Sequence, residues 1–176
     1  DINLCDELID FFHRHKTLQT SGYVNLSGIM PSVVNKEFKD STDLNILWEV
    51  SETDETIKKY QEQVIKQVIK YGNKYECIQS LNIQSYKPKG GYKAWHFERS
   101  QNTQERVFAF MTYLNDVPDG GTEFFYQETT TKAKKGDTVI WPTEWTHTHK
   151  SQVSKKHEKY IATGWLELKK EEIRTE

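Results

Sequence analysis

Residues 107–114 read VFAFMTYL, and this stretch decides the fold class that the sequence predicts. Apolar residues occupy both faces of an extended chain here, which is typical of a strand covered on both sides. Earlier in the chain Tyr75, Cys77, Leu81 and Ile83 fall on alternating positions, as they would in a strand. Shorter strands, separated by turns with Gly and Pro, are expected at residues 94–98, 122–126, 129–133, 138–141, 146–149 and 160–168. About eight short strands at this spacing indicate a β-sandwich or barrel.

The chain before these strands has helical periodicity in two places. Leu4, Leu8, Phe11 and Phe12 fall at positions i, i+4, i+7 and i+8, which predicts an amphipathic helix. A second helix is expected over residues 51–71, where carboxylates near the start suit the unpaired N–H groups of a first turn. Its apolar face would comprise Ile57, Tyr60, Val64, Ile65, Val68 and Ile69.

Together these patterns predict one mainly β (α+β) domain over residues 1–176. Residues 1–73 would form a helical N-terminal part, and residues 74–170 would form the β core, with the two helices packed on its outside. The formal net charge of −2 gives no electrostatic reason to expect a nucleic-acid partner. No apolar run reaches the ~20 residues that span a bilayer, so no membrane partner is expected. Two cysteines are too few for a disulfide framework, and a cytoplasmic protein with reduced thiols is the simplest interpretation.

A candidate metal site begins at His96-Phe97-Glu98. In a strand, residues i and i+2 point to the same face, so the imidazole and the carboxylate can converge on one ion. His147 and His149 lie about fifty residues downstream on another expected strand, and periodicity cannot choose between them. Two histidines and one carboxylate make the facial triad of non-haem Fe(II) oxygenases, which leaves coordination positions open. The competing interpretation is a strand whose H-x-E pair binds no metal.

Lys159 is the second unusual residue, because it starts the apolar, aromatic stretch YIATGW at residues 160–165. An inward-pointing lysine on such a strand is costly to bury without an anion, and a carboxylate ligand is the simplest partner. The alternative is a solvated surface lysine, like its neighbours Lys155 and Lys156.

These residues, taken together, resemble a known family. The segments YKPKGGY (86–92), WHFE (95–98), the strand at 106–114 with Asn115-Asp116, GGTEF (120–124), KGD (135–137), His149 and Lys159 to Trp165 are similar to the prolyl 4-hydroxylase-like Fe(II)/2-oxoglutarate dioxygenases. The likeness runs over about residues 75–166, and short members from phages and marine bacteria look closest. It implies a double-stranded β-helix (jelly-roll) core with a metal site inside one open end, and a location in the cytoplasm of a bacterium or phage-infected host cell.

The resemblance also implies roles for single residues. His96, Glu98 and His149 would be the iron ligands, although many members have Asp where this chain has Glu98. Lys159 would pair with the distal carboxylate of 2-oxoglutarate, and Trp165 would line the same pocket. The remaining residues are Tyr86, which would help to hold the cosubstrate, and three supporting or alternative residues, His147, Tyr92 and Arg99.

The activity that the resemblance implies is hydroxylation of a C–H bond, first of all in a peptidyl proline, with succinate and CO2 as coproducts. Fe(II), 2-oxoglutarate and O2 would be required, with ascorbate as a candidate reductant and a peptide or protein as the partner. Two alternatives stay open. The enzyme could act on a lysyl residue, a free amino acid or a small metabolite, or the chain could be a non-catalytic jelly-roll module that binds ligands on its aromatic residues.

Overall fold

A computed structural model describes residues 1–24, 33–47, 54–71 and 75–168. The helices are α1 (Ile2–Arg14) and α3 (Glu55–Val68), with 3-10 turns η1 (Lys16–Leu18), η2 (Ile69–Tyr71) and η3 (Trp145–His147). The strands are β1 (Thr20–Ser21), β2 (Lys39–Asp40), β3 (Thr42–Leu47), β4 (Tyr75–Tyr86), β5 (Gly91–Tyr92), β6 (Phe108–Tyr113), β7 (Thr122–Phe124), β8 (Thr129–Thr130), β9 (Thr138–Pro142), β10 (His149–Ser151) and β11 (Lys159–Leu168).

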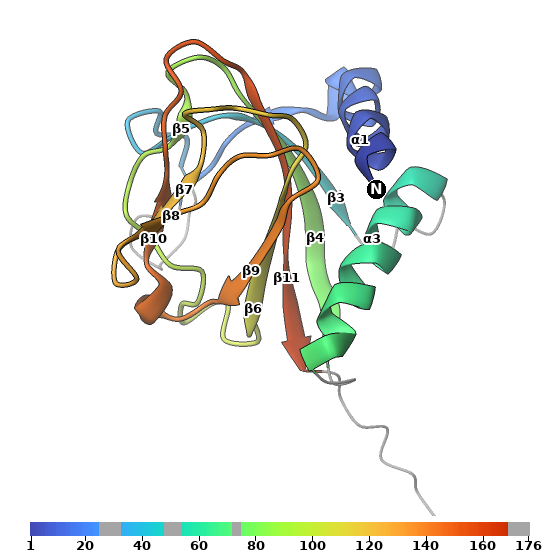
Figure 1. The fold of residues 1–176 in the computed structure, drawn as a ribbon, viewed down its shortest axis with the longest axis vertical. Coiled ribbons are helices and arrows are strands. Elements are labelled where there is room, and N and C mark those ends of the chain that lie inside the picture. Colours follow the sequence, from blue (N-terminus) through green and yellow to red (C-terminus); the bar gives the residue numbers. More distant parts are fainter. Residues whose placement is uncertain (25–32, 48–53, 72–74, 169–176) are drawn as a thin grey trace, which may run out of the picture.

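The strands form two opposing layers. The larger sheet has the order β1-β3-β4-β11-β6-β9, and its paired strands run antiparallel. A smaller sheet, β10-β7-β8, lies opposite the larger one. Strand β2 pairs with β5, which lies on the same side of the molecule as the smaller sheet. Both helices pack on the outer face of the larger sheet (Figure 1). This arrangement is a jelly roll with two external helices, which confirms the predicted fold class.

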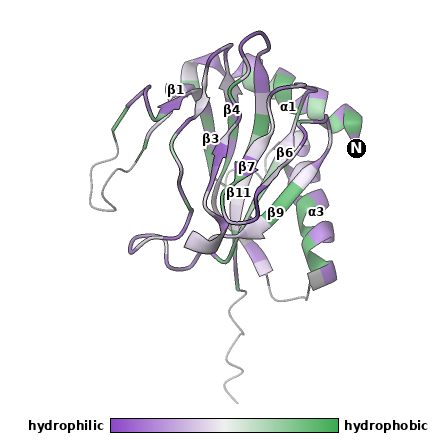
Figure 2. Ribbon diagram, turned by 60° about the vertical axis from the view of Figure 1, so that its left-hand side comes forward, coloured by the Kyte–Doolittle hydropathy of each residue, from purple (hydrophilic) through white to green (hydrophobic). Residues whose placement is uncertain are grey.

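The two helices form for the reasons that the sequence indicated. Asp54 caps α3 by accepting hydrogen bonds from the backbone N–H groups of Thr56 and Ile57. Apolar side chains of α1 and α3 are buried against the larger sheet, and polar and apolar residues alternate along α3 in Figure 2. The prediction for Ile69 was wrong, because α3 gives way to a 3-10 turn after Val68 and leaves Ile69 50% exposed. Residues 51–53 of the expected helix lie outside the described residues.

Strand β11 divides the interior into two faces. Its alternate residues Lys159 and Ile161 belong to the side that faces the smaller sheet, whereas Ala162 and Leu166 belong to the core under the helices. Gly164 belongs to the helix side too, where an added Cβ would lie 2.6 Å from the Phe110 ring. Alternate residues of β11 therefore line the space between the two sheets, and the residues between them pack under the helices.

The N-terminal part, which we expected to be helical, also contributes strands β1, β2 and β3. Sequence patterning missed β3 because its inward side chains are polar: Asp43 is buried between the sheets, and Leu44 faces the helices. Several other expected strands are shorter than predicted. Residues 94–98 contribute only a single bridge, at His96, and in the stretch 146–149 only His149 is in a strand, because η3 precedes β10. Of the strands expected at 122–126 and 129–133, only β7 (Thr122–Phe124) and β8 (Thr129–Thr130) form. Within the described residues no helix is long and apolar enough to cross a bilayer.

Candidate metal centre

Three predicted ligand residues, His96, Glu98 and His149, come together between the two sheets. Glu98 Oε1 lies 3.6 Å from His96 Nε2 and 3.4 Å from His149 Nε2. One donor atom from each residue falls within 4.8 Å of the others, a spacing that could hold a single metal ion. The pairing is built into the backbone, because His96 and His149 exchange reciprocal N–H···O=C hydrogen bonds of 3.0 and 2.9 Å.

Hydrogen bonds orient both imidazoles. His96 Nδ1 lies 2.9 Å from the Ala94 carbonyl and His149 Nδ1 lies 2.8 Å from the His147 carbonyl, so in each ring Nδ1 carries the proton. Each Nε2 lone pair is then free to bind a metal, which is the usual arrangement for metal-ligating histidines. Tyr92 stacks on the His96 ring with centroids 3.6 Å apart and an interplanar angle of 12°, and this contact fixes the ring plane.

The electrostatics of the cluster suit a divalent cation. Burial, followed by the charge of nearby His149, lowers the pKa of His96 to about 4, so this ring is neutral at pH 7. Burial alone would raise the pKa of Glu98. The hydrogen bond that the protonated form of His149 donates, the positive charges of protonated His96 and His149, and the charge of Arg106 outweigh burial and hold that pKa below its usual range. A carboxylate and neutral imidazole without thiolate form a donor set suited to Fe(II).

The second oxygen of Glu98 is held by Trp165 of β11 and by Arg106, which lies in the loop before β6. Trp165 Nε1 donates to Glu98 Oε2 over 3.0 Å, and the Arg106 guanidinium lies 3.6 Å from the same oxygen. Arg106 also stacks over the Trp165 ring, with its Cζ 3.6 Å from the ring centroid. Sequence reasoning missed Arg106, which the loop between the two residues brings back to Glu98: Arg106 Nη1 also donates to the Glu98 carbonyl over 3.2 Å. Trp165 thus contacts the candidate ligand itself, in addition to lining the predicted pocket.

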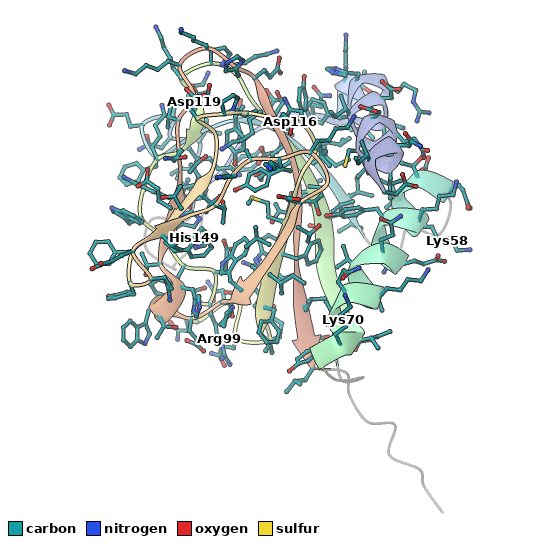
Figure 3. The ribbon with its side chains drawn as sticks, in the orientation of Figure 1. Lys58, Lys70, Arg99, Asp116, Asp119 and His149 are labelled. Atoms are coloured by element: carbon teal, nitrogen blue, oxygen red, sulfur yellow. The ribbon has the colours of Figure 1, made fainter. Side chains whose placement is uncertain are left out.

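Two supporting candidates, His147 and Arg99, lie outside the cluster. His147 belongs to η3, and its Nδ1 hydrogen-bonds to Thr146 instead of facing the other rings. The expected shared face of His147 and His149 required a continuous strand, and the 3-10 turn removes it. Arg99, which is labelled in Figure 3, is partly exposed and forms an ion pair with Glu144.

A cavity of about 250 Å³ extends from the cluster between the sheets. Lys159 lies on its wall and is only 3% exposed, so the inward orientation is the one observed. Its Nζ donates to three neutral oxygens, those of Gly120, Ser151 and Gln152, and no carboxylate of the described residues forms an ion pair with it. Burial lowers the pKa of Lys159 to about 8. A ligand carboxylate would supply the missing counter-charge.

Two aromatic residues complete this part of the cavity wall. The Tyr86 ring lies 5.4 Å from Lys159 Nζ, and its hydroxyl donates to Gln84 Oε1 over 2.7 Å, so toward a ligand this oxygen can only accept. Trp141 Nε1, beside His149, is a buried donor without a hydrogen-bond partner in the described part of the chain. A donor of this kind is normally satisfied by water or ligand oxygen. The lining residues are therefore compatible with both a metal ion and a dicarboxylate.

Solved structures with this fold include three prolyl hydroxylases. The viral collagen prolyl hydroxylase of Paramecium bursaria Chlorella virus-1 is 20% identical, with a TM-score of 0.62 over 94% of this chain and 90% of that chain. A Pseudomonas putida prolyl-4-hydroxylase is 14% identical, with a TM-score of 0.66 over 97% and 89%. A Trichoplax adhaerens prolyl hydroxylase, bound to a hypoxia inducible factor peptide fragment, is 13% identical, with a TM-score of 0.71 over 93% and 76%.

A search of curated protein sequences found no significant match. Residues 81–167, in contrast, match the 2OG-Fe(II) oxygenase superfamily. The matched segment contains all three residues of the cluster as well as Lys159 and Trp165. On this match, residues 81–167 belong to the 2OG-Fe(II) oxygenase superfamily, and the solved structures share the fold of the chain.

Proposed function

We propose that this protein hydroxylates a prolyl residue of a peptide in an Fe(II)- and 2-oxoglutarate-dependent reaction. The proposal depends on one observation: a single cavity is lined both by a possible metal site and by a buried ammonium group. The metal site is formed by His96, Glu98 and His149, and the ammonium group belongs to Lys159. The family match supports the oxygenase chemistry. The prolyl hydroxylase neighbours, one of them bound to a peptide fragment, support the substrate class.

Each residue of the cavity would have a separate role in this reaction. His96 Nε2, Glu98 Oε1 and His149 Nε2 would hold Fe(II), and Lys159 would bind the far carboxylate of 2-oxoglutarate. Bound there, the metal supplies the O2 activation that couples decarboxylation of 2-oxoglutarate, to succinate and CO2, with hydroxylation of a substrate C–H bond. Trp165 keeps Glu98 in place through its indole N–H. No general base is required, and ascorbate stays a candidate reductant.

The competing function, a non-catalytic binding module, does not need a buried lysine whose acceptors are all neutral. A direct test separates the two. Under anaerobic conditions, adding 2-oxoglutarate to the Fe(II)-loaded protein should produce a visible charge-transfer band, and adding O2 and proline-containing peptides should give succinate and a +16 Da product. Absence of both the band and succinate would leave only the binding module.

A further inference from the structure

A second polar cluster lies on the wall of the same cavity. Lys39 and Asp43 are both buried, at 7% and 6% exposure, and Lys39 Nζ lies 2.6 Å from Asp43 Oδ2. Strands β2 and β3 place the pair close to the metal centre, since Lys39 Nζ lies 5.8 Å from the centroid of Tyr92, whose ring stacks on His96. Neither residue belongs to the proposed metal site or to the proposed binding site for 2-oxoglutarate.

Hydrogen bonds give this wall a defined polarity. Gln84 Nε2 donates to Asp43 Oδ2 over 3.3 Å, and the Tyr86 hydroxyl donates to Gln84 Oε1 over 2.7 Å. A carboxylate only accepts, so the Gln84 amide must turn its NH2 group toward Asp43 and its oxygen toward Tyr86. The Tyr86 proton is then committed to Gln84, and the free side of its hydroxyl oxygen can only accept. The wall therefore offers acceptors to whatever enters the cavity.

One of these acceptors lacks a donor. Asp43 Oδ1 is buried and has no hydrogen-bond partner among the described residues. An unsatisfied buried acceptor is costly, and one on a cavity-lining residue is normally satisfied by water or by a ligand. The negative charge of Asp43 is already balanced by Lys39. A ligand ammonium group that bonded to Asp43 Oδ1 would be repelled by the nearby charge of Lys39. A neutral N–H group of the ligand could donate to the same oxygen without this repulsion.

We propose that Asp43, held by Lys39 and Gln84, is a specificity-determining residue that accepts a hydrogen bond from a backbone amide N–H of a peptide substrate. This inference rests on the proposed function and narrows it, because it favours a peptide over a free amino acid. A prolyl residue has no amide N–H of its own, so the donor comes from a neighbouring residue of the peptide.

The test removes one N–H from the ligand. The probes are acetyl-Ala-Pro-Gly-N-methylamide, the three depsipeptide analogues in which the Ala amide, the Gly amide or the terminal amide is an ester, and free L-proline. Dissociation constants are measured by calorimetry on protein loaded with Mn(II) and 2-oxoglutarate. We expect one ester to bind about tenfold more weakly than the amide, because the Asp43 acceptor is left unsatisfied, and free L-proline to bind more weakly than the peptide. Equal binding of the amide and all three esters, or tighter binding of L-proline, would overturn the inference.

A matched pair of variants locates the effect. Lys39→Met/Asp43→Leu removes the buried pair, and Lys36→Met/Asp40→Leu removes an exposed pair with the same i,i+4 spacing in the same segment. We expect the amide-to-ester preference to fall to about one in the first variant and to persist in the second. Full preference in the first variant overturns the role of Asp43. The anaerobic charge-transfer band with Fe(II) and 2-oxoglutarate distinguishes failure of this inference from failure of the proposed function. If the wild-type protein gives no band, the proposed function is refuted. If the band is present but amide and ester bind equally, only this inference is refuted. If the buried-pair variant does not fold, the amide and ester comparison on the wild-type protein still decides.

Discussion

Replacement of Lys159 by Met keeps the length of a buried side chain and removes its charge. Lys159 is 3% exposed, and burial lowers its pKa from 10.5 to about 8. At about 1.36 kcal/mol for each pKa unit, the charged form costs the folded protein about 3 kcal/mol when no anion is bound. This cost is opposed by the donors that Nζ supplies to Gly120, Ser151 and Gln152. We therefore expect Lys159→Met to change the free energy of unfolding at pH 7 by no more than about 2 kcal/mol.

Cosubstrate binding should respond much more strongly. With 2-oxoglutarate bound, Lys159 would face a carboxylate, and truncating one partner of a buried charge pair costs about 2–5 kcal/mol. The dissociation constant for 2-oxoglutarate should then rise by at least about 30-fold. The assay is an anaerobic titration of the Fe(II)-loaded protein, followed by its charge-transfer band, with the exposed Lys156→Met as the control. An unchanged dissociation constant would refute the assigned role of Lys159.

The pH dependence of stability gives an independent check on the same residue. Between pH 8 and 10.5 the unfolded chain still holds the lysine proton that folded Lys159 has lost, so the free energy of unfolding rises with pH across this window. The contribution is absent below about pH 8 and complete above 10.5. Urea denaturation at several pH values should show this rise in the wild-type protein relative to Lys159→Met. Parallel stability curves for the two proteins would contradict the burial of a charged lysine.

Three further substitutions test other parts of the structure. His149→Ala should abolish Fe(II) binding and succinate formation while His147→Ala retains both; the reverse result would make His147 the third ligand. Trp165→Phe removes the hydrogen bond to Glu98 Oε2, and we expect metal affinity, measured by chelator competition, to fall about 10- to 100-fold, with no change counting against that contact. Leu8→Ala, at a fully buried position on the inner face of α1, should lower the free energy of unfolding, measured in urea, by about 2–5 kcal/mol. A loss below about 1 kcal/mol would contradict the tight packing of α1 against the sheet.

Much of the fold follows from periodicity because burial imposes it directly. The stretch at 107–114, with apolar residues on both faces, contains β6, and Leu8 lies on the buried face of α1, as their patterns predict. Periodicity fails where a buried face is polar. The inward residues of β3 include Asp43, which is buried by an ion pair with Lys39 that no local pattern reveals. Periodicity also fails at His96, which forms a single backbone bridge with His149 instead of belonging to the expected strand.

The candidate site was predictable where its residues are close in sequence or belong to a recognisable set. His96 and Glu98 were found from their spacing, and Lys159 was notable because it starts an apolar strand. The choice between His147 and His149 depended on η3, whose 3-10 geometry the sequence did not indicate. Arg106 reaches Glu98 because the loop between them folds back, and the sequence pattern carried no signal for that loop conformation.

The alternation of faces along β11 restricts how this protein can change over evolutionary time. A single-residue insertion or deletion within the strand would exchange its two faces, moving side chains such as Ala162 and Lys159 into each other's environments. Such length changes should be eliminated by selection in β11 and tolerated in loops. Point substitutions on the cavity side can instead alter ligand preference while the helix-facing residues go on holding the sheet together, so new specificities can arise without loss of the scaffold.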